Sequence, residues 1–561
     1  MRPVEAEDLI GLIHSKAADA VVKVTNPRPT RIYAEVKPGC HREVIDQLLE
    51  GFDGLGISTI TGVHDRNQIE LNYHLRCGGN ILTLRTRVPT SEPKIETITD
   101  LMPGAILYER EVKDLLGVEF TGLVETERLQ LPDGWPKGVY PLRKDCNLDE
   151  VSLQTNGGQA LEGSNNEETL SELGNIEVVF GPQHPALHEP EKFLFEVDGE
   201  RVIDIKPRLG YAHRGIEKAT EARTLLQDIY LVERICGICN SAHTLCFCQA
   251  VEDIADIRVP DRARYLRVIA AELNRIHSHM LLLGSAGLEL GLESLFMYVW
   301  RDRERVMDAL ERLTGNRVIS ALNTFGGTRR DLSPDVAKSI LKDLSELRKR
   351  MSYYRKVFEE DPTLRLRTLG IGVLSRASSV RLSAVGPVAR ASGVEFDVRK
   401  DDPYAAYGEI PFEIVTFKEG DVYSRLRARV EEVFESIGIV EYAIAHLPSG
   451  PYRVRVSRTQ PPGEAVCRVE APRGEDVHYV KTNGTAYPER VKVRSPTLAN
   501  IASLCTMLRG CFVADIPSIL VSIDPCFSCT DRLAFLNVQN GERWSLRADQ
   551  VSRLRGGRDG R

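Results

Sequence analysis

The length, composition and charge of the chain indicate a folded protein of two or more domains. Its 561 residues exceed what a single hydrophobic core normally supports, and 42% hydrophobic with 27% charged residues is the composition of a globular protein. The formal net charge of −7 provides no overall basic field, which argues against a nucleic-acid partner.

Residues 1–145 are expected to form a compact α+β domain. Residues 4–23 have a helical pattern, whereas residues 31–36 and 81–88 alternate between apolar and polar side chains as strands do. The first 24 residues contain Glu5 and Asp8 and no uninterrupted apolar stretch. We therefore predict no secretory signal and expect the chain in the cytoplasm.

Three segments near the end of this domain form a signature. They are YEREVKDLLG at residues 108–117, LPDGW at 131–135 and PLRKD at 141–145. Together they resemble the 30-kilodalton subunit of respiratory complex I. No metal ligands cluster in this part of the sequence, so we expect a docking and scaffolding domain.

A linker and a larger domain follow. Residues 146–173 are rich in Asn, Gly, Ser, Glu and Gln, which is typical of a flexible linker. Residues 174–532 are expected to form a mostly α catalytic domain, with long helices over 260–288, 293–317 and 333–360. The window at 280–300 is the most membrane-like, but it contains acidic residues and glycines, which favour a buried helix. Any membrane attachment should then come from partner subunits.

Two CxxC pairs, far apart in the sequence, supply four candidate thiolates. Cys236 and Cys239 form the first pair, and Cys526 and Cys529 form the second. Four thiolates complete one site for a soft metal such as nickel, iron, copper or zinc. A structural zinc site usually has its two pairs about 15–20 residues apart, so a zinc scaffold fits this spacing poorly.

Local patterns predict how each pair is presented. On a helix, Cys236, Cys239 and His243 would fall on one face and could meet a single metal. Asp524 and Pro525 before the second pair are typical of a helix start, where the helix dipole favours thiolate over thiol.

The full motifs around these pairs point to a family. RICGICNSAH at residues 234–243 and DPCFSCTDR at 524–532 resemble the large subunit of nickel-iron hydrogenases. GPQHP at 181–185 resembles a segment shared by the complex I 49-kilodalton subunit and the membrane-bound hydrogenases related to it. The catalytic domain is therefore expected to have the fold of these two subunits, in the membrane-bound, complex I-related group of the formate hydrogenlyase type. The resemblance implies a nickel-iron centre whose iron binds carbon monoxide and cyanide. It makes Cys236 and Cys526 terminal nickel ligands and Cys239 and Cys529 bridges. His243 would hydrogen-bond a bridging sulfur.

Three further residues match the surroundings of that centre. Glu217, in RGIE at 214–217, would transfer protons, with a pKa tuned close to working pH. Its alternative is a surface glutamate paired with Lys218 or Arg214. Arg473, in EAPRG at 470–474, and Thr497, in RSPT at 494–497, would donate hydrogen bonds to the cyanide ligands, and Arg473 would also polarise H2. An exposed arginine and a turn threonine are the alternatives there.

Histidines near these motifs stay ambiguous. His184 matches a histidine that lines the quinone cavity of complex I, and an ordinary hydrogen-bonded histidine flanked by prolines is the alternative. His213, beside the RGIE motif, is open in the same way.

The resemblance implies an oxidoreductase that interconverts H2 with protons and electrons, evolving H2. Beyond the two pairs the cysteines show no set for an iron-sulfur cluster, so such clusters are expected in partner subunits only. The expected partners are an iron-sulfur small subunit, a ferredoxin-like subunit, integral membrane subunits and an electron donor such as formate dehydrogenase. The chain would then lie on the inner face of the cell membrane. A structural or quinone-site subunit of a complex I-like NADH/quinone oxidoreductase is the alternative, which four intact cysteines argue against.

The C-terminus resembles a removable tail. Family members lose a tail to a maturation endopeptidase just past the second CxxC motif, and the matching bond here is Arg532-Leu533. The tail, residues 533–561, is polar and Arg-rich from Gly541 onward, so it has little apolar surface to anchor it, although an ordinary frayed terminus is the alternative. Because Arg532 stands where standard uptake enzymes end in His, a magnesium site cannot be inferred from the resemblance.

Overall fold

The computed structural model describes residues 4–529, apart from 126, 132–134, 147–175, 185–186 and 188, together with the backbone of 535–536 and 543–544. Almost all of the expected linker and of the expected C-terminal tail therefore lies outside the described residues.

The N-terminal region is an α+β domain, as predicted. Its five-stranded sheet has the order β1-β2-β5-β4-β3, in which β2 and β5 run parallel and the other neighbours antiparallel. The elements are α1 (Ala6–Lys16), β1 (Val21–Arg28), β2 (Arg31–Val36), α2 (His41–Gly51), β3 (Gly56–Asp65), β4 (Gln68–Cys77), β5 (Asn80–Pro89), β6 (Lys94–Glu96), α3 (Ile106–Leu116) and β7 (Glu119–Thr121).

The expected helix over residues 4–23 is wrong at its end. Helix α1 stops at Lys16, and the β-branched pair Val21-Val22 opens strand β1 instead. Valine favours the extended backbone because its branched side chain is restricted in a helix. The predicted strands at 31–36 and 81–88 are confirmed within one residue at each end.

The face of the sheet near β3 lies against the second domain, so nearly every residue of β3 and β4 is buried. Polar groups cross this boundary: Arg490 donates to the Gly62 carbonyl at 3.1 Å, and Arg494 donates to the Ser58 carbonyl at 2.6 Å. Both arginines are buried, so these hydrogen bonds fix the two domains against each other.

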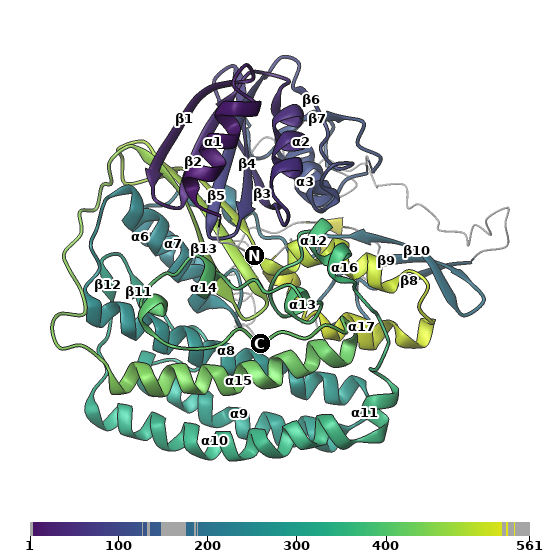
Figure 1. The fold of residues 1–561 in the computed structure, drawn as a ribbon, viewed down its shortest axis with the longest axis vertical. Coiled ribbons are helices and arrows are strands. Elements are labelled where there is room, and N and C mark those ends of the chain that lie inside the picture. Colours follow the sequence, from purple (N-terminus) through teal and green to yellow (C-terminus); the bar gives the residue numbers. More distant parts are fainter. Residues whose placement is uncertain are drawn as a thin grey trace, which may run out of the picture.

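Four long helices form the far side of the second domain (Figure 1). They are α8 (Asp261–Glu289), α9 (Glu293–Thr314), α10 (Pro334–Glu360) and α15 (Val422–Ala445), and α8 packs against both α9 and α15. The three predicted helices are confirmed, but the window at 280–300 is two helices rather than one. Gly291, at φ +88°, lies in the turn between them. Within the described ranges, no helix is both long enough and apolar enough to cross a membrane.

A small antiparallel sheet lies between the N-terminal domain and the long helices, with α7 (Asn240–Ile254) packed against it (Figure 1). Its order is β13 (Gly463–Ala471), β14 (Gly474–Thr482) and β15 (Pro488–Arg494). Pro472 and Arg473 form the tight turn from β13 to β14. Gly474 fits there because a Cβ would come within 2.7 Å of the Gly386 nitrogen. The sheet places Arg473 and the side chains of β14 beside the cysteine pairs.

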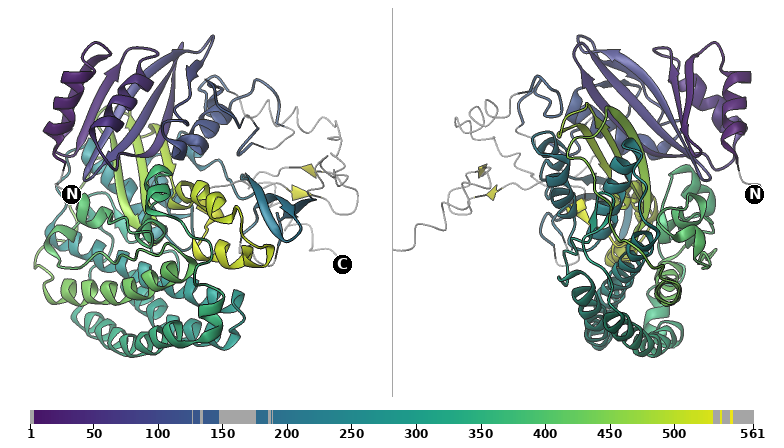
Figure 2. Two further views of the ribbon diagram at one scale, coloured as in Figure 1. Left: turned by 45° about the vertical axis from the view of Figure 1, so that its right-hand side comes forward. Right: turned by 90° about the vertical axis from the view of Figure 1, so that its left-hand side faces the viewer.

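A second three-stranded sheet, with the order β10 (Arg201–Arg208), β9 (Lys192–Asp198) and β8 (Ile176–Phe180), projects from the side of the domain (Figure 2). The remaining described elements are α5 (Ile216–Thr220), α6 (Leu225–Glu233), β11 (Asn323–Thr324), β12 (Gly327–Thr328), α11 (Pro362–Leu366), α12 (Arg376–Arg381), α13 (Gly386–Arg390), α14 (Val398–Asp401), α16 (Pro496–Leu508), α17 (Ile516–Ser522), β16 (Phe535–Leu536), β17 (Arg543–Trp544) and four short 3-10 turns.

Candidate metal centre

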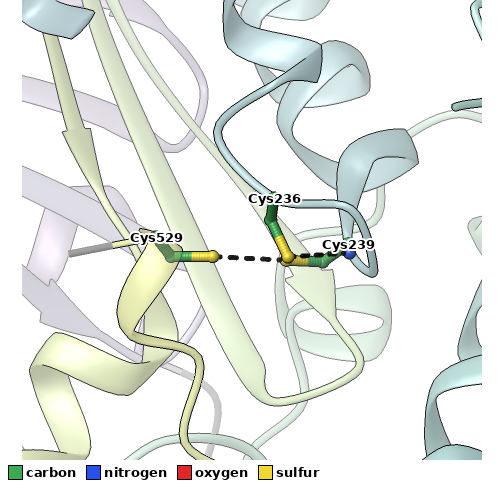
Figure 3. A group of neighbouring side chains, drawn as sticks. All are labelled: Cys236, Cys239 and Cys529. Carbon is green, nitrogen blue, oxygen red and sulfur yellow. Dashed lines mark hydrogen bonds between the residues drawn. The ribbon is translucent and has the colours of Figure 1, made fainter. Parts of the chain in front are cut away.

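The four cysteines of the two CxxC pairs meet at one point. The Cys236 and Cys526 sulfurs are 3.2 Å apart, those of Cys526 and Cys529 are 3.1 Å apart, and those of Cys239 and Cys529 are 3.6 Å apart. Figure 3 shows Cys236 and Cys239, from the segment that enters α7, facing Cys529. Three of the four are buried and Cys529 is half-buried.

The first pair is presented by a turn and not by a continuous helix. Helix α7 begins only at Asn240, so Cys239 precedes it and Cys236 lies in the turn after α6. The expectation of one helix through Cys236, Cys239 and His243 is therefore wrong. The turn frees the backbone N–H groups of Ile238 and Cys239, which donate to the Cys236 sulfur at 3.2 and 3.3 Å. Such donors stabilise a thiolate.

The second pair does not begin an α-helix either. Asp524 has a left-handed backbone at φ +58°, and residues Phe527–Cys529 form only a single 3-10 turn. The predicted helix start at Asp524 is therefore wrong. Without a helix start at Asp524, no helix dipole favours the thiolate form of this pair. A side chain supports the pair instead, since the Cys526 N–H donates to the Thr497 hydroxyl at 3.1 Å.

The charges of the four sulfurs depend on one another. Hydrogen bonds from the Cys239 and Cys526 thiols hold the pKa of Cys236 well below its ordinary value. The contacts with Cys236 and Cys239 raise the pKa of Cys529 well above its ordinary value. Four adjacent thiolates need a bound cation to offset their repulsion, and soft sulfur donors fit a thiophilic metal.

A buried His-Asp-His group supports the cysteines from behind. The His243 Nε2 atom lies 3.7 Å from the sulfurs of both Cys239 and Cys529, within reach of the predicted hydrogen bond. Its Nδ1 atom lies 3.0 Å from Asp476, which is also 3.3 Å from His478. Burial alone would lower the pKa of His243, but the Asp476 carboxylate and Cys239 outweigh it and raise that pKa well above its ordinary value.

Sequence reasoning missed Asp476 and His478. Both lie on β14, and because alternate strand residues share a face they point the same way. Asp476 and His478 follow Arg473 by three and five positions, and this closeness to the EAPRG motif is the only signal in the sequence that they belong to the site.

Arg473 and Thr497 both lie at the centre. Arg473 is buried and donates to the backbone carbonyl and the carboxylate of Asp524, each at 2.6 Å, and to the Ser278 hydroxyl at 3.2 Å. Burial would lower the pKa of Arg473, but Asp524 outweighs it, with a smaller contribution from Cys526, and that pKa is raised well above its ordinary value. The alternatives of an exposed arginine and a turn threonine are wrong, since Thr497 is buried in α16.

Glu217 lies in α5 and faces two cations. Its carboxylate lies 2.8 Å from Arg490 and 3.3 Å from Lys492, and it accepts a hydrogen bond from the Val493 N–H at 3.1 Å. Burial alone would raise the pKa of Glu217, but Lys492 and Arg490 outweigh it and lower that pKa. The expectation of a pKa tuned upward toward working pH is therefore not met by this carboxyl alone.

The alternative for Glu217, a surface pairing with its sequence neighbours, is wrong. Lys218 pairs with Glu221 at 3.1 Å, and Arg214 donates to the backbone carbonyls of Arg234 and Ser528. Arg214 thereby connects the first CxxC segment to the second.

One cavity is shared by Glu217 and one of the four cysteines, Cys529. It is lined by Glu217, Cys529, Glu111, Gln130 and His213, among others. The ring of His184, in contrast, lies against that of Phe180 with centroids 3.7 Å apart.

Glu189 is a further residue that sequence reasoning missed. It accepts a hydrogen bond from the Ser528 N–H at 2.6 Å, and its carboxylate lies 4.0 Å from the Cys526 sulfur. It enters from the segment before β9, far from either CxxC pair in the sequence but only four positions after the GPQHP motif.

Comparison with known proteins places this geometry in a family. Residues 34–152 match the model of the respiratory-chain NADH dehydrogenase 30 Kd subunit, and residues 289–462 and 453–532 match that of the 49 Kd subunit. Residues 214–283, which hold Glu217 and the first CxxC pair, match the nickel-dependent hydrogenase model. The chain is 38% identical over 460 residues to formate hydrogenlyase subunit 5 of Escherichia coli, covering 82% of this chain and 80% of that protein. The chain belongs to the complex I-related hydrogenase family.

Other relatives of the chain differ in their names. The membrane-bound hydrogenase subunit alpha of Pyrococcus furiosus is 38% identical over 395 residues, with 68% of this chain and 92% of that protein covered. An NADH-quinone oxidoreductase protein of the C/D type from Phocaeicola vulgatus is 32% identical over 517 residues, with 89% and 97% covered. The chain is therefore an oxidoreductase subunit of this family, with the fused arrangement that the sequence predicted.

Proposed function

We propose that this chain is the catalytic subunit of a nickel-iron hydrogenase that interconverts H2 with protons and electrons and runs toward H2. The observation that supports this most is the convergence of four cysteine sulfurs, 3.1 to 3.6 Å apart along the contacts given above, beside a cavity lined by Glu217. A purely structural metal site would need neither a proton-transfer group nor a cavity beside it.

The sulfurs suit the proposed centre. Cys236 and Cys526 would be terminal nickel ligands, and Cys239 and Cys529 would bridge nickel to an iron that binds carbon monoxide and cyanide. When bound, this centre supplies the electron exchange and the polar splitting or joining of H2. We do not propose a magnesium site.

The side chains around the centre have separate tasks. Arg473 keeps a fixed positive charge in a buried site and would hydrogen-bond cyanide with Thr497, so its field acts with little screening. His243, held at Nδ1 by Asp476, presents Nε2 to the sulfurs of Cys239 and Cys529, which would be the bridges. Glu217 would pass protons between the cavity and the centre.

The proposal requires partner subunits. Apart from the site described, no cysteine group that could hold a metal occurs in the described part of the chain, so the iron-sulfur clusters would belong to a small subunit and a ferredoxin-like subunit. Integral membrane subunits would attach the chain to the inner face of the cell membrane, in keeping with the name of the Pyrococcus relative. A formate dehydrogenase is the electron donor that the Escherichia relative's name suggests.

Domain boundaries and maturation complete the proposal. The chain would consist of a docking domain over residues 1–145, a linker over 146–173 and a catalytic domain over 174–532. An endopeptidase would remove residues 533–561 after nickel insertion.

A second candidate function has its own support. The Phocaeicola relative, named as part of an NADH-quinone oxidoreductase, covers 89% of this chain, which favours a structural or quinone-site subunit. Such a subunit would need no nickel.

Paired alanine variants of two cysteines separate these functions. Cys239→Ala removes a proposed bridging ligand, whereas Cys248→Ala removes an equally buried cysteine on α7. In complexes purified from cells, we expect Cys239→Ala to abolish nickel content and H2 evolution from a reduced viologen dye, and Cys248→Ala to retain both. A Cys239→Ala variant that retains nickel content and activity, as Cys248→Ala is expected to, would rule out the proposed centre.

A further inference from the structure

A buried group of charges spans the boundary between the two domains beside the cavity. Lys492, on β15, lies 2.6 Å from Glu111 of the N-terminal domain and 3.3 Å from Glu217 of the catalytic domain. Arg490 closes the group at 2.8 Å from Glu217. The side chains of Lys492 and Arg490 are 3% exposed, that of Glu111 is 6% exposed and that of Glu217 is 12% exposed, so their charges interact strongly.

The cavity beside the metal centre reaches both carboxyl groups. Glu111, Glu217 and Cys529 all line it. The second carboxyl oxygen of Glu111 is buried and has no hydrogen-bond partner in the described part of the structure, and the side-chain oxygen of Gln130 is in the same state. A buried carboxyl oxygen that lacks a donor is suited to hold a proton or to accept one from cavity water.

The two carboxyls differ in their environment. Burial raises the pKa of Glu111 more than Lys492 lowers it, and the charge of Glu217 raises it further. Lys492 and Arg490 lower the pKa of Glu217. Because the two carboxyls interact, a proton held by the pair belongs to both of them, and the opposite directions of the two pKa shifts favour Glu111 as the carboxyl that holds it.

We propose that Glu111 shares a proton with Glu217 through the Lys492 ammonium and thereby resupplies Glu217 with the protons consumed at the metal centre. This inference rests on the proposed hydrogenase function. The proton donor, Glu111, belongs to the N-terminal domain, which the sequence predicts to be a docking and scaffolding domain. This domain would therefore contribute a side chain to proton transfer. Glu111 acts through Glu217 and is a positioning residue.

The transfer balances at each step. Starting with the shared proton on Glu111 and with Glu217 as a carboxylate, Lys492 donates one N–H proton to Glu217 and receives the Glu111 proton in return, so the ammonium is restored. Glu217 then gives its proton to the centre, and the Glu111 carboxylate takes up a proton that reaches it from solvent through cavity water. One proton enters from solvent for each proton delivered, and two such cycles with two electrons from the partner subunits form one H2.

The main test replaces Glu111 by a residue that cannot carry a proton. Glu111→Gln keeps the size of the side chain, and we measure H2 evolution per bound nickel against pH in the purified complex. We expect the rate at neutral pH to fall about tenfold, less than the roughly 100-fold expected for a group that acts at the centre itself, because Glu111 acts only through Glu217. The pH above which the rate declines should also shift downward, because Glu217 alone has a lowered pKa.

Three matched variants isolate the effect. Glu109→Gln changes another buried glutamate of α3, which bonds to Ile98 and Thr97 on another side of the helix, and should leave rate and pH profile unchanged. Lys492→Arg keeps the charge but cannot release a proton, so it should reproduce the loss even if Glu111→Gln folds poorly. Glu111→Asp should recover part of the rate and the wild-type pH limb.

The outcomes separate the relay from the function on which it rests. Wild-type complex without nickel or H2 evolution would overturn the proposed function itself. Active wild type with an unchanged pH profile in both Glu111→Gln and Lys492→Arg would overturn the relay alone, whatever the change in rate.

Discussion

Replacing Arg473 by lysine tests how the metal centre is held. The guanidinium makes three hydrogen bonds, to the Asp524 carbonyl, the Asp524 carboxylate and the Ser278 hydroxyl. A lysine keeps the charge but can reach one of these groups from its single nitrogen, so about two hydrogen bonds are lost. At about 1 kcal/mol net for each, the change costs about 2 kcal/mol.

Part of this cost should appear in the reaction, because Asp524 adjoins the second CxxC pair. If all of it did, the rate would fall about 30-fold, since each 1.36 kcal/mol is a factor of ten. The assay is H2 evolution per bound nickel, with the infrared frequencies of the cyanide ligands. Arg468→Lys is the control, because Arg468 is equally buried but pairs with Asp402 and Glu475 at the domain boundary. An Arg473→Lys enzyme with the wild-type rate per nickel and unchanged cyanide frequencies would show that the Arg473 guanidinium does not support the centre.

Two more outcomes are expected. Glu217→Gln still accepts the Val493 N–H but cannot carry a proton, so H2 evolution should fall by at least about 100-fold at unchanged nickel content, and an unchanged rate would exclude Glu217 from proton transfer. Mass spectrometry of the active enzyme should find Arg532 as its last residue, with the full 561-residue chain accumulating in nickel-starved cells, and an active enzyme that retains residues 533–561 would contradict the maturation proposal.

Patterns within a short stretch of sequence predicted much of the fold. The helices over 260–288, 293–317 and 333–360 and the strands over 31–36 and 81–88 were found because each buries one face at a regular period. The same approach failed at the metal site, where Cys236 lies in a turn and Asp524 adopts a left-handed backbone. Contacts between the two pairs decide those conformations, and local propensity does not include them.

The charged partners of the site could not be predicted either. Lys492 lies 275 positions from Glu217 and 381 positions from Glu111, and no periodic pattern relates residues so distant. The lowered pKa of Glu217 follows from Lys492 and Arg490, so an expectation based on the RGIE motif alone missed it. Complete motifs identified the four cysteines, Arg473 and Thr497 because those residues lie within the signatures themselves.

The metal content of the mature, wild-type complex, together with its infrared spectrum, tests the proposed nickel-iron centre most plainly. We expect about one nickel and one iron bound by the four cysteines of this chain, and sharp infrared bands from carbon monoxide and cyanide on that iron. One equivalent of zinc, or no metal at all, without those bands would contradict the assignment of a nickel-iron hydrogenase.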